Sequence, residues 1–489
     1  MDREQSLKQI EEVVSSGKFK ASWESLMEYQ PPQWYKASKF GIFIHWGIYA
    51  VPAFNNEWYP RNMYIQGTAE FEHHIATYGP HKEFGYKDFI PMFKAEKFNA
   101  HEWAELFEKS GARYVIPVAE HHDGFQMYKS DISIYNACNM GPERDVLGEL
   151  KAAFLRHNLI IGASSHRIEH WFFLGHGKEF DSDIKEPLVK GDFYWPSMPE
   201  YDHNDINSPS PSEEFMEDWL LRTCELVDRY QPRVIYFDWW VQHSAMKPYL
   251  KKFAAYYYNR AVEWDIEVVI NYKHDAFMFG SAIVDVERGH FSDTKPYYWQ
   301  SCTSVARNSW CHTTSNVYKT AAEILCELVD IVSKNGNLLL NIGPKADGTI
   351  PEEDRKILEE IGKWLSVNGE AIYDTSIWRL YGEGPTRTEE GHFTENSAKE
   401  YTSGDIRFTV KGSRIYATVL KYPDNGEVII TSFAERSASK ASQFAGIIQD
   451  VSVLGFEEKP VWKRTEEGLI INTCNVHSDK PVALKLLVD

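Results

Sequence analysis

Carboxylates and imidazoles stand at the ends of several apolar, aromatic runs of this sequence. The run "VIYFDWW", residues 234–240, has the pattern of a buried strand, yet it carries the carboxylate of Asp238. An ionised carboxylate in an apolar core is costly unless it is paired. We therefore expect Asp238 either to pair with a cation or to end its strand facing a cavity.

Other apolar runs end in the same way. The polar residues at these ends are His45 beside Trp46, then Glu120, His121, His122 and Asp123, then His166, Lys273, Asp285 and Glu287. One buried polar group is an ordinary feature of a core, because it is usually hydrogen-bonded. Chemistry-bearing residues at six strand ends instead predict a functional site.

Short apolar runs alternate with amphipathic helical patterns along most of the chain. The runs are residues 40–47, 114–122, 159–166, 233–240, 267–273, 282–289 and 336–344, and the helical patterns are 101–111, 145–158, 211–230, 318–336 and 351–369. This alternation predicts parallel strands joined by helices. Seven or eight such units without a GxGxxG after the first strand favour an α/β fold, a (β/α)8-like (TIM-type) barrel, whose strand ends form one catalytic rim.

The pattern changes near residue 375. Beyond it, alternating apolar residues and turn signals such as "PDNG" predict an antiparallel β-sandwich. We therefore expect a catalytic barrel with an N-terminal helical lead-in over residues 1–375 and a C-terminal β-sandwich domain over residues 376–489.

Composition excludes some partners and favours others. The net charge of −19 argues against nucleic acid, which needs a basic surface. The acidic start lacks a secretory pattern, and no apolar run approaches the ~20 residues that span a bilayer, so no membrane contact is expected. Six scattered cysteines without a CxxC predict reduced thiols and a cytoplasmic protein. The aromatic content of 14% suits a cleft that binds a sugar.

Four kinds of site compete for the predicted rim. A metal site is disfavoured, because there is no His-x-His or HExxH, and adjacent His121 and His122 would point to opposite faces of a regular strand. A serine nucleophile lacks the GxSxG elbow. Asp238 and Glu287 could instead be the two carboxylates of a retaining glycosidase. A barrel that only binds carbohydrate remains an alternative.

Three long motifs extend this interpretation. The segments "WYKASKFGIFIHWGIYAVPAFNNEWYPRNMY" (34–64), "GARYVIPVAEHHDGFQMYKS" (111–130) and "NGNLLLNIGPKADGTIPEE" (335–353), with "VIYFDWW" between them, resemble the α-L-fucosidases of glycoside hydrolase family 29. The resemblance covers roughly residues 30–375. It implies a barrel followed by a β-sandwich and retaining hydrolysis of α-L-fucosides without a cofactor.

The resemblance also implies roles for single residues. The family's nucleophile falls on Asp238, and its aromatic residue near the sugar methyl group falls on Trp310. Its other sugar-binding residues fall on His45, Glu57, Trp58, His121 and His122.

The acid/base residue varies in position within the family. We assign it to Glu287, at the end of the sixth run, over its rivals Glu57, Glu120 and Glu169. Glu120 is expected to face away from His121 by strand alternation. His166 and Lys273 stand where relatives carry other residues, so their roles are left open.

The sequence therefore predicts a cytoplasmic retaining α-L-fucosidase that acts on a fucosylated oligosaccharide or glycoconjugate, with a homo-oligomer possible. The alternatives are a glycosidase of the same mechanism for an α-L-galactoside, in which a hydroxyl partner replaces the apolar contact to the C5 methyl group, and a catalytically silent carbohydrate-binding barrel.

Overall fold

A computed structural model describes residues 3–199, 210–395, 400–436, 442 and 444–489 of the chain. Eight parallel strands form a closed barrel in the order β1 to β8. They are β1 (Phe40–Ile44), β2 (Tyr114–Glu120), β3 (Ile160–Ser165), β4 (Val234–Phe237), β5 (Val269–Lys273), β6 (Ile283–Glu287), β7 (Trp299–Ser304) and β8 (Gly336–Ile342). The predicted α/β barrel is confirmed.

One strand had no counterpart among the apolar runs. Strand β7 reads "WQSCTS", and all of its residues are buried although most are polar. Gln300 explains how this is possible: its amide oxygen accepts hydrogen bonds from Tyr35 and Tyr114, and its amide nitrogen donates to Asp285. Buried polar groups that are fully paired cost little, so the strand forms without an apolar pattern.

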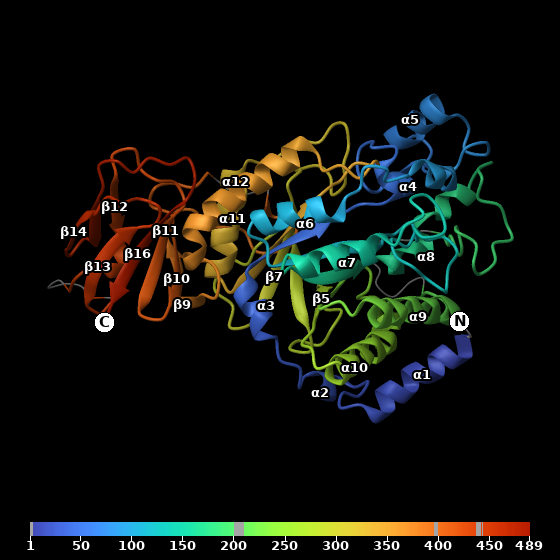
Figure 1. The fold of residues 1–489 in the computed structure, drawn as a ribbon, viewed down its shortest axis with the longest axis horizontal. Coiled ribbons are helices and arrows are strands. Elements are labelled where there is room, and N and C mark those ends of the chain that lie inside the picture. Colours follow the sequence, from blue (N-terminus) through green and yellow to red (C-terminus); the bar gives the residue numbers. More distant parts are fainter. Residues whose placement is uncertain (1–2, 200–209, 396–399, 437–441, 443) are drawn as a thin grey trace.

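Helices surround the barrel (Figure 1). The longer ones are α6 (Ala100–Lys109), α7 (Val146–Arg156), α9 (Glu213–Tyr230), α10 (Lys247–Glu263), α11 (Ala321–Ser333) and α12 (Glu352–Asn368). Their starts carry side-chain caps where the sequence offers them. Ser212 accepts from the backbone of α9, and Thr320 forms a reciprocal capping box with Glu323 at the start of α11.

Further helices belong to the N-terminal part and to the loops. They are α1 (Arg3–Ser16), α2 (Trp23–Leu26), α3 (Gln33–Ser38), α4 (Tyr59–Asn62), α5 (Ala69–Tyr78) and α8 (His170–Phe173). The predicted helical lead-in is α1, which packs against α9 and α10. Figure 1 shows α4, α5 and α8 together at the end of the barrel opposite the C-terminal sheets.

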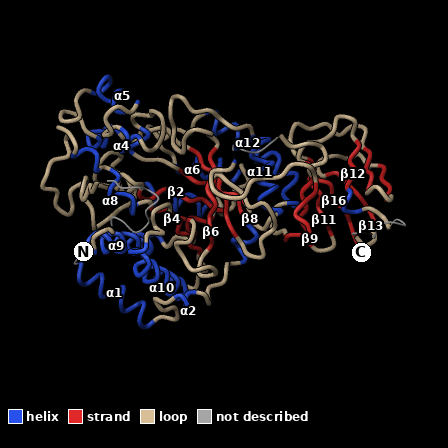
Figure 2. Tube along the Cα trace, turned by 180° about the vertical axis from the view of Figure 1, so that it is seen from behind, coloured by secondary structure: helices blue, strands red, loops and turns tan. Residues whose placement is uncertain are grey.

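The C-terminal part holds two antiparallel sheets, as predicted. One has the strand order β13-β16-β11-β10-β9 and the other β12-β15-β14. Their bounds are β9 (Ser376–Glu383), β10 (Ile406–Lys411), β11 (Arg414–Val419), β12 (Glu427–Ile430), β13 (Ile448–Val453), β14 (Val461–Arg464), β15 (Leu469–Asn472) and β16 (Val482–Val488). Figure 2 shows these strands as a second group beside the barrel strands.

The barrel and the sheets share a buried contact. Helix α11 packs against β9 and β10, and its Asp330 pairs with Lys334 at 2.6 Å and with Arg407 of β10. Among the described residues, no helix is both long enough and apolar enough to cross a bilayer.

Candidate active site

A cavity of about 1010 Å³ opens at the C-terminal ends of the barrel strands. All eight residues predicted for the site line it: His45, Glu57, Trp58, His121, His122, Asp238, Glu287 and Trp310. His45 follows β1 directly, Asp238 follows β4, and Glu287 is the last residue of β6. The end of each strand therefore places its polar residue on the same rim.

Asp238 both faces the cavity and has partners for its charge, so both of the expected arrangements occur. Its side chain is only 15% exposed and faces the cavity, and it has imidazole partners. His166 Nδ1 lies 2.9 Å from Asp238 Oδ2, and His122 Nε2 lies 3.5 Å from the same atom. Burial raises the pKa of Asp238, but His166 and the more distant Lys273 outweigh burial and hold this pKa well below its ordinary value.

Glu287 has a different environment. Its Oε2 accepts a hydrogen bond from Trp239 Nε1 at 2.5 Å and lies 3.0 Å from Lys273 Nζ. Burial raises the pKa of Glu287, and Lys273 opposes this increase while the charge of Asp238 adds to it. The net direction is upward.

The two carboxyl groups of one cavity are thus driven in opposite directions. Asp238 is held ionised, and Glu287 is biased toward its protonated form. A pair whose pKa values are separated in this way can divide the roles of nucleophile and proton donor between them.

Asn341 of β8 positions two of the predicted binding residues. Its Oδ1 lies 2.7 Å from His45 Nδ1, and its amide nitrogen donates to the backbone oxygen of Trp310 at 2.6 Å. Burial, with the nearby His166, lowers the pKa of His45 well below its ordinary value, so the imidazole is neutral. The Trp310 ring lies tilted at 5.2 Å from the His45 ring and has the Arg288 guanidinium over it at 4.6 Å.

Glu57 and Trp58 come from the loop before α4. Glu57 Oε2 accepts from the backbone nitrogen of Trp310 at 2.8 Å and from Ser309 Oγ at 3.3 Å. Burial raises the pKa of Glu57 against these hydrogen bonds. Trp58 stands edge-on to His122 at 5.7 Å, so it forms part of the aromatic wall.

His121 and His122 do not point to opposite faces, and that expectation was wrong. Strand β2 ends at Glu120 after an irregularity between Val118 and Glu120, so both histidines lie beyond its regular alternation. Their rings are 4.3 Å apart and both line the cavity. Burial lowers the pKa of both, that of His122 to about 3. His121 Nδ1 is buried without a hydrogen-bond partner among the described residues, which leaves this nitrogen free to bind a ligand in the cavity.

The same convergence removes one argument against a metal. The ligand atoms of His45, His121 and His166 lie within 4.8 Å of one another, and so do those of His122, His166 and Asp238. The expectation that no metal is needed therefore stays a prediction that chelation must test.

Several strand-end residues are buried in the core and do not line the cavity: Trp46, Glu120, Asp123, Lys273 and Asp285. Glu120 pairs with Arg222 at 3.0 Å and Arg167 at 3.3 Å, turned away from the cavity as expected. Asp285 lies inside the barrel at 2.7 Å from Lys273 Nζ. Trp46 packs against Trp103 in the outer core. Strand alternation separates such residues from their cavity-facing neighbours.

Some lining residues had no assigned role in the sequence. His166 was noticed as a strand end, and Trp239 stands beside Asp238 in "VIYFDWW". Phe393 also lines the cavity, although it comes from beyond β9. Glu169, a rival for the acid, lines the cavity too, with its Oε2 3.5 Å from His122 Nδ1.

The chain is similar to known proteins over most of its length. The family described as alpha-L-fucosidase matches residues 6–370, and its C-terminal domain family matches residues 398–486. The chain is 31% identical to tissue alpha-L-fucosidase of Rattus norvegicus over 92% of this chain and 87% of that one. It is 32% identical to plasma alpha-L-fucosidase of Pongo abelii over 85% and 82%.

A solved structure extends the likeness to the whole fold. The Thermotoga maritima alpha-fucosidase in complex with fucose is 30% identical, with a TM-score of 0.75 over 96% of this chain and 100% of that one. The chain therefore belongs to the α-L-fucosidase family of glycoside hydrolases, glycoside hydrolase family 29.

Proposed function

We propose that this enzyme hydrolyses terminal α-L-fucosides with retention of configuration, with Asp238 as the nucleophile and Glu287 as the acid/base. The observation that carries the proposal is the opposed environment of the two carboxyl groups. His166 stabilises the anion of Asp238, whereas burial and the charge of Asp238 favour a proton on Glu287. A related Thermotoga maritima alpha-fucosidase has been solved with fucose, which supports fucose as the sugar.

In the first step the Asp238 carboxylate forms a bond to the anomeric carbon. The glycosidic C–O bond breaks, and Glu287 gives its proton to the departing oxygen. The products are a β-linked fucosyl ester on Asp238 and a free leaving-group alcohol.

In the second step Glu287, now ionised, removes a proton from water. The water oxygen bonds to the anomeric carbon and the ester bond to Asp238 breaks. Two inversions release α-fucose, and both carboxyl groups return to their starting states.

The remaining lining residues would hold the sugar. Neutral imidazoles can both donate to and accept from hydroxyl groups, and His121 has a buried ring nitrogen with no partner among the described residues. With His45, His122 and Glu57 it would bind the hydroxyl groups. The rings of Trp58 and Trp310 would contact the apolar parts of the sugar.

The experiment is to follow early hydrolysis of an aryl α-L-fucoside by proton NMR, before the product anomers equilibrate. The proposal requires α-fucose as the first product. Early β-fucose would contradict retention, and equal or faster cleavage of the matching α-L-galactoside would contradict the choice of sugar.

We also propose that the enzyme works in a reducing compartment such as the cytoplasm. The support is chemical: all six cysteines are free thiols, three of them buried. Fractionation of the source cells tests this, because recovery of the enzyme outside the cytoplasmic fraction would contradict it.

A further inference from the structure

A segment that follows the first strand of the C-terminal sheets lies on the rim of the barrel. Gly391 N donates to His290 O at 3.0 Å, Phe393 N to Glu287 O at 2.8 Å, and Glu395 N to Arg288 O at 2.9 Å. Residues 390–395 therefore run beside residues 287–290, which continue from β6. The approach is close: a Cβ on Gly289 would lie 1.9 Å from Gly391 O.

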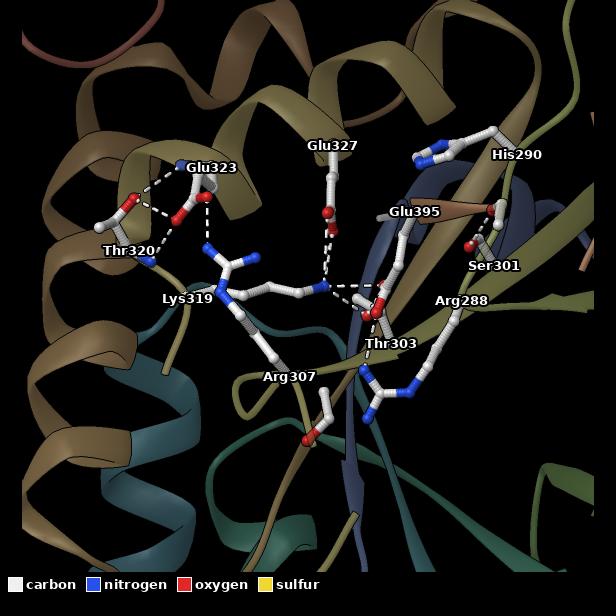
Figure 3. Close-up of polar contacts among 12 residues, drawn as sticks. Arg288, His290, Ser301, Thr303, Arg307, Lys319, Thr320, Glu323, Glu327 and Glu395 are labelled. Atoms are coloured by element: carbon white, nitrogen blue, oxygen red, sulfur yellow. Dashed lines mark hydrogen bonds and ion pairs between the residues drawn. The ribbon is translucent and has the colours of Figure 1, made fainter. Parts of the chain in front are cut away.

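Buried charges hold the end of this segment (Figure 3). The Glu395 carboxylate lies 2.7 Å from Arg288 Nη1 and 2.8 Å from Lys319 Nζ, and it accepts from Thr303 Oγ1. Burial raises the pKa of Glu395, but Lys319 and Arg288 outweigh burial and lower it to about 2. The carboxylate is thus ionised and paired on both sides, which fixes the segment to β6 and β7.

Another residue of this segment, His392, contacts the proposed acid directly. Glu287 N donates to His392 Nδ1 at 3.0 Å, so this nitrogen must be unprotonated. Burial and the nearby Lys273 lower the pKa of His392 to about 4, which keeps it so. The segment therefore supports the backbone of Glu287.

Phe393 is unusual in three ways. It is 59% exposed, it lines the cavity, and its φ of 59° lies in the left-handed region that bulky residues avoid. Its ring is nearly parallel to that of Trp239, with 20° between planes and 5.9 Å between centroids. Trp239 in turn donates to Glu287. Two aromatic rings thus stand beside the proposed proton donor.

We propose that Trp239 and Phe393 form the subsite for the leaving group, a neutral pyranose whose apolar face packs on these rings. This inference rests on the proposed function. Because Glu287 must protonate the glycosidic oxygen, the sugar attached to that oxygen lies next to Glu287. The fucosyl unit occupies the side of Asp238 and the imidazoles, so the rings flanking Glu287 are left for the leaving group. A segment from beyond the barrel then helps to set which fucosides are cleaved.

The test compares two substrates that differ only in the leaving group. Fucosyl-α-(1→2)-galactose has a leaving sugar, whereas α-L-fucosyl fluoride has none and needs little proton donation. Phe393→Ala should lower kcat/KM for the disaccharide about three- to tenfold, the value of one aromatic contact, and leave the fluoride unchanged. Phe393→Trp should restore cleavage of the disaccharide.

Two further variants separate binding from folding. Phe393→Gly removes the ring and relieves the left-handed backbone, so it should show the same selectivity with no loss of thermal stability. Phe279 is equally exposed at 59% but does not line the cavity, so Phe279→Ala should leave kcat/KM unchanged for both substrates.

The subsite proposal would be overturned if Phe393→Ala and Phe393→Gly lowered kcat/KM equally for the disaccharide and the fluoride. It would also be overturned if neither variant changed kcat/KM for either substrate. A wild-type enzyme that cleaves neither substrate would instead overturn the proposed function. A second readout is transfer: with galactose present, both Phe393 variants should divert less of the fucosyl ester from water to the sugar acceptor, and an unchanged ratio would contradict the proposal.

Discussion

His166 Nδ1 and Asp238 Oδ2 lie 2.9 Å apart, at the ends of adjacent strands β3 and β4. The contact joins a fully buried imidazole to a carboxylate that faces the cavity. His166 is the strongest single partner that lowers the pKa of Asp238, and burial acts against it. The pair therefore sets the lower end of the pH range in which the nucleophile is ionised.

Replacing His166 should move that limit. Without its partner the Asp238 carboxylate is harder to ionise, so its pKa rises and the acidic limb of the kcat/KM profile shifts to higher pH. A hydrogen bond to a charged group predicts a shift of about one to two pH units for His166→Phe. The matched control is His157→Phe, which removes another histidine–carboxylate pair, 2.7 Å from Glu108 and outside the cavity. An acidic limb that shifts equally in both variants, or in neither, would contradict this role.

Glu287→Ala should produce a dependence on the leaving group. The leaving sugar of a natural disaccharide departs as an alkoxide unless its oxygen is protonated, so cleavage of the disaccharide should almost cease. An activated aryl fucoside should still form the β-linked fucosyl ester on Asp238. Azide should restore turnover by displacing Asp238 from that ester with inversion, which gives α-fucosyl azide.

Glu169→Ala is the control for Glu287→Ala. Glu57 and Glu169 also line the cavity, but the Glu57 carboxylate is hydrogen-bonded to the backbone of Trp310, so Glu169 is the rival to test. Steady-state rates of each variant with both substrates decide the assignment. If Glu169→Ala shows the leaving-group dependence and Glu287→Ala does not, the acid is Glu169.

Lys273 should affect both stability and the pH profile. Its ammonium is completely buried between Asp285 at 2.7 Å and Glu287 at 3.0 Å. Lys273→Met leaves Asp285 buried and unpaired, which should cost about 3–5 kcal/mol of folding free energy. The cation lowers the pKa of both Asp238 and Glu287, so its loss should move both limbs of the profile to higher pH.

Lys334→Met is the matched control for that variant. Lys334 forms an equally buried pair with Asp330 at 2.6 Å, away from the cavity. It should lower the melting temperature by a smaller amount, because Asp330 keeps Arg407 as a partner, and leave the pH profile where it was. A profile unchanged by Lys273→Met, in a protein that is still folded, would rule out this electrostatic role.

Activity should survive chelation. Neutral imidazoles can bind hydroxyl groups directly, and the proposed mechanism needs no Lewis acid. Dialysis against a strong chelator, followed by metal analysis and assay, tests this. The histidine cluster makes the test necessary, since its ring nitrogens are close enough to share an ion. Loss of activity that zinc or manganese alone restores would show that the mechanism is wrong.

The barrel and most of its rim could be predicted because the strands are continuous apolar runs that end in polar residues. Asp238 is an example: it follows the four fully buried residues of β4. The sequence-based prediction failed where the local pattern of apolar and polar residues did not determine the structure. Strand β7 is polar yet buried, and the end of β2 departs from regular alternation, so His121 and His122 turn to the same cavity.

Phe393 could not have been assigned from the sequence. It lies more than 150 residues after Asp238, beyond the first strand of another sheet, in a stretch without a motif. Its position depends on tertiary contacts, above all the burial of Glu395 between Arg288 and Lys319. Only the folded chain brings it to the rim.

The most direct test of the account is to trap the fucosyl-enzyme. A 2-fluoro-fucosyl reagent with a good leaving group should inactivate the enzyme. The fluorine slows both formation and hydrolysis of the ester, whereas the good leaving group speeds formation alone, so the ester accumulates. Peptide mass spectrometry should then find the added sugar on Asp238, and Asp238→Ala should take up no label while losing several orders of magnitude in turnover. A label on any other residue would contradict the assignment of the nucleophile and, with it, the proposed mechanism.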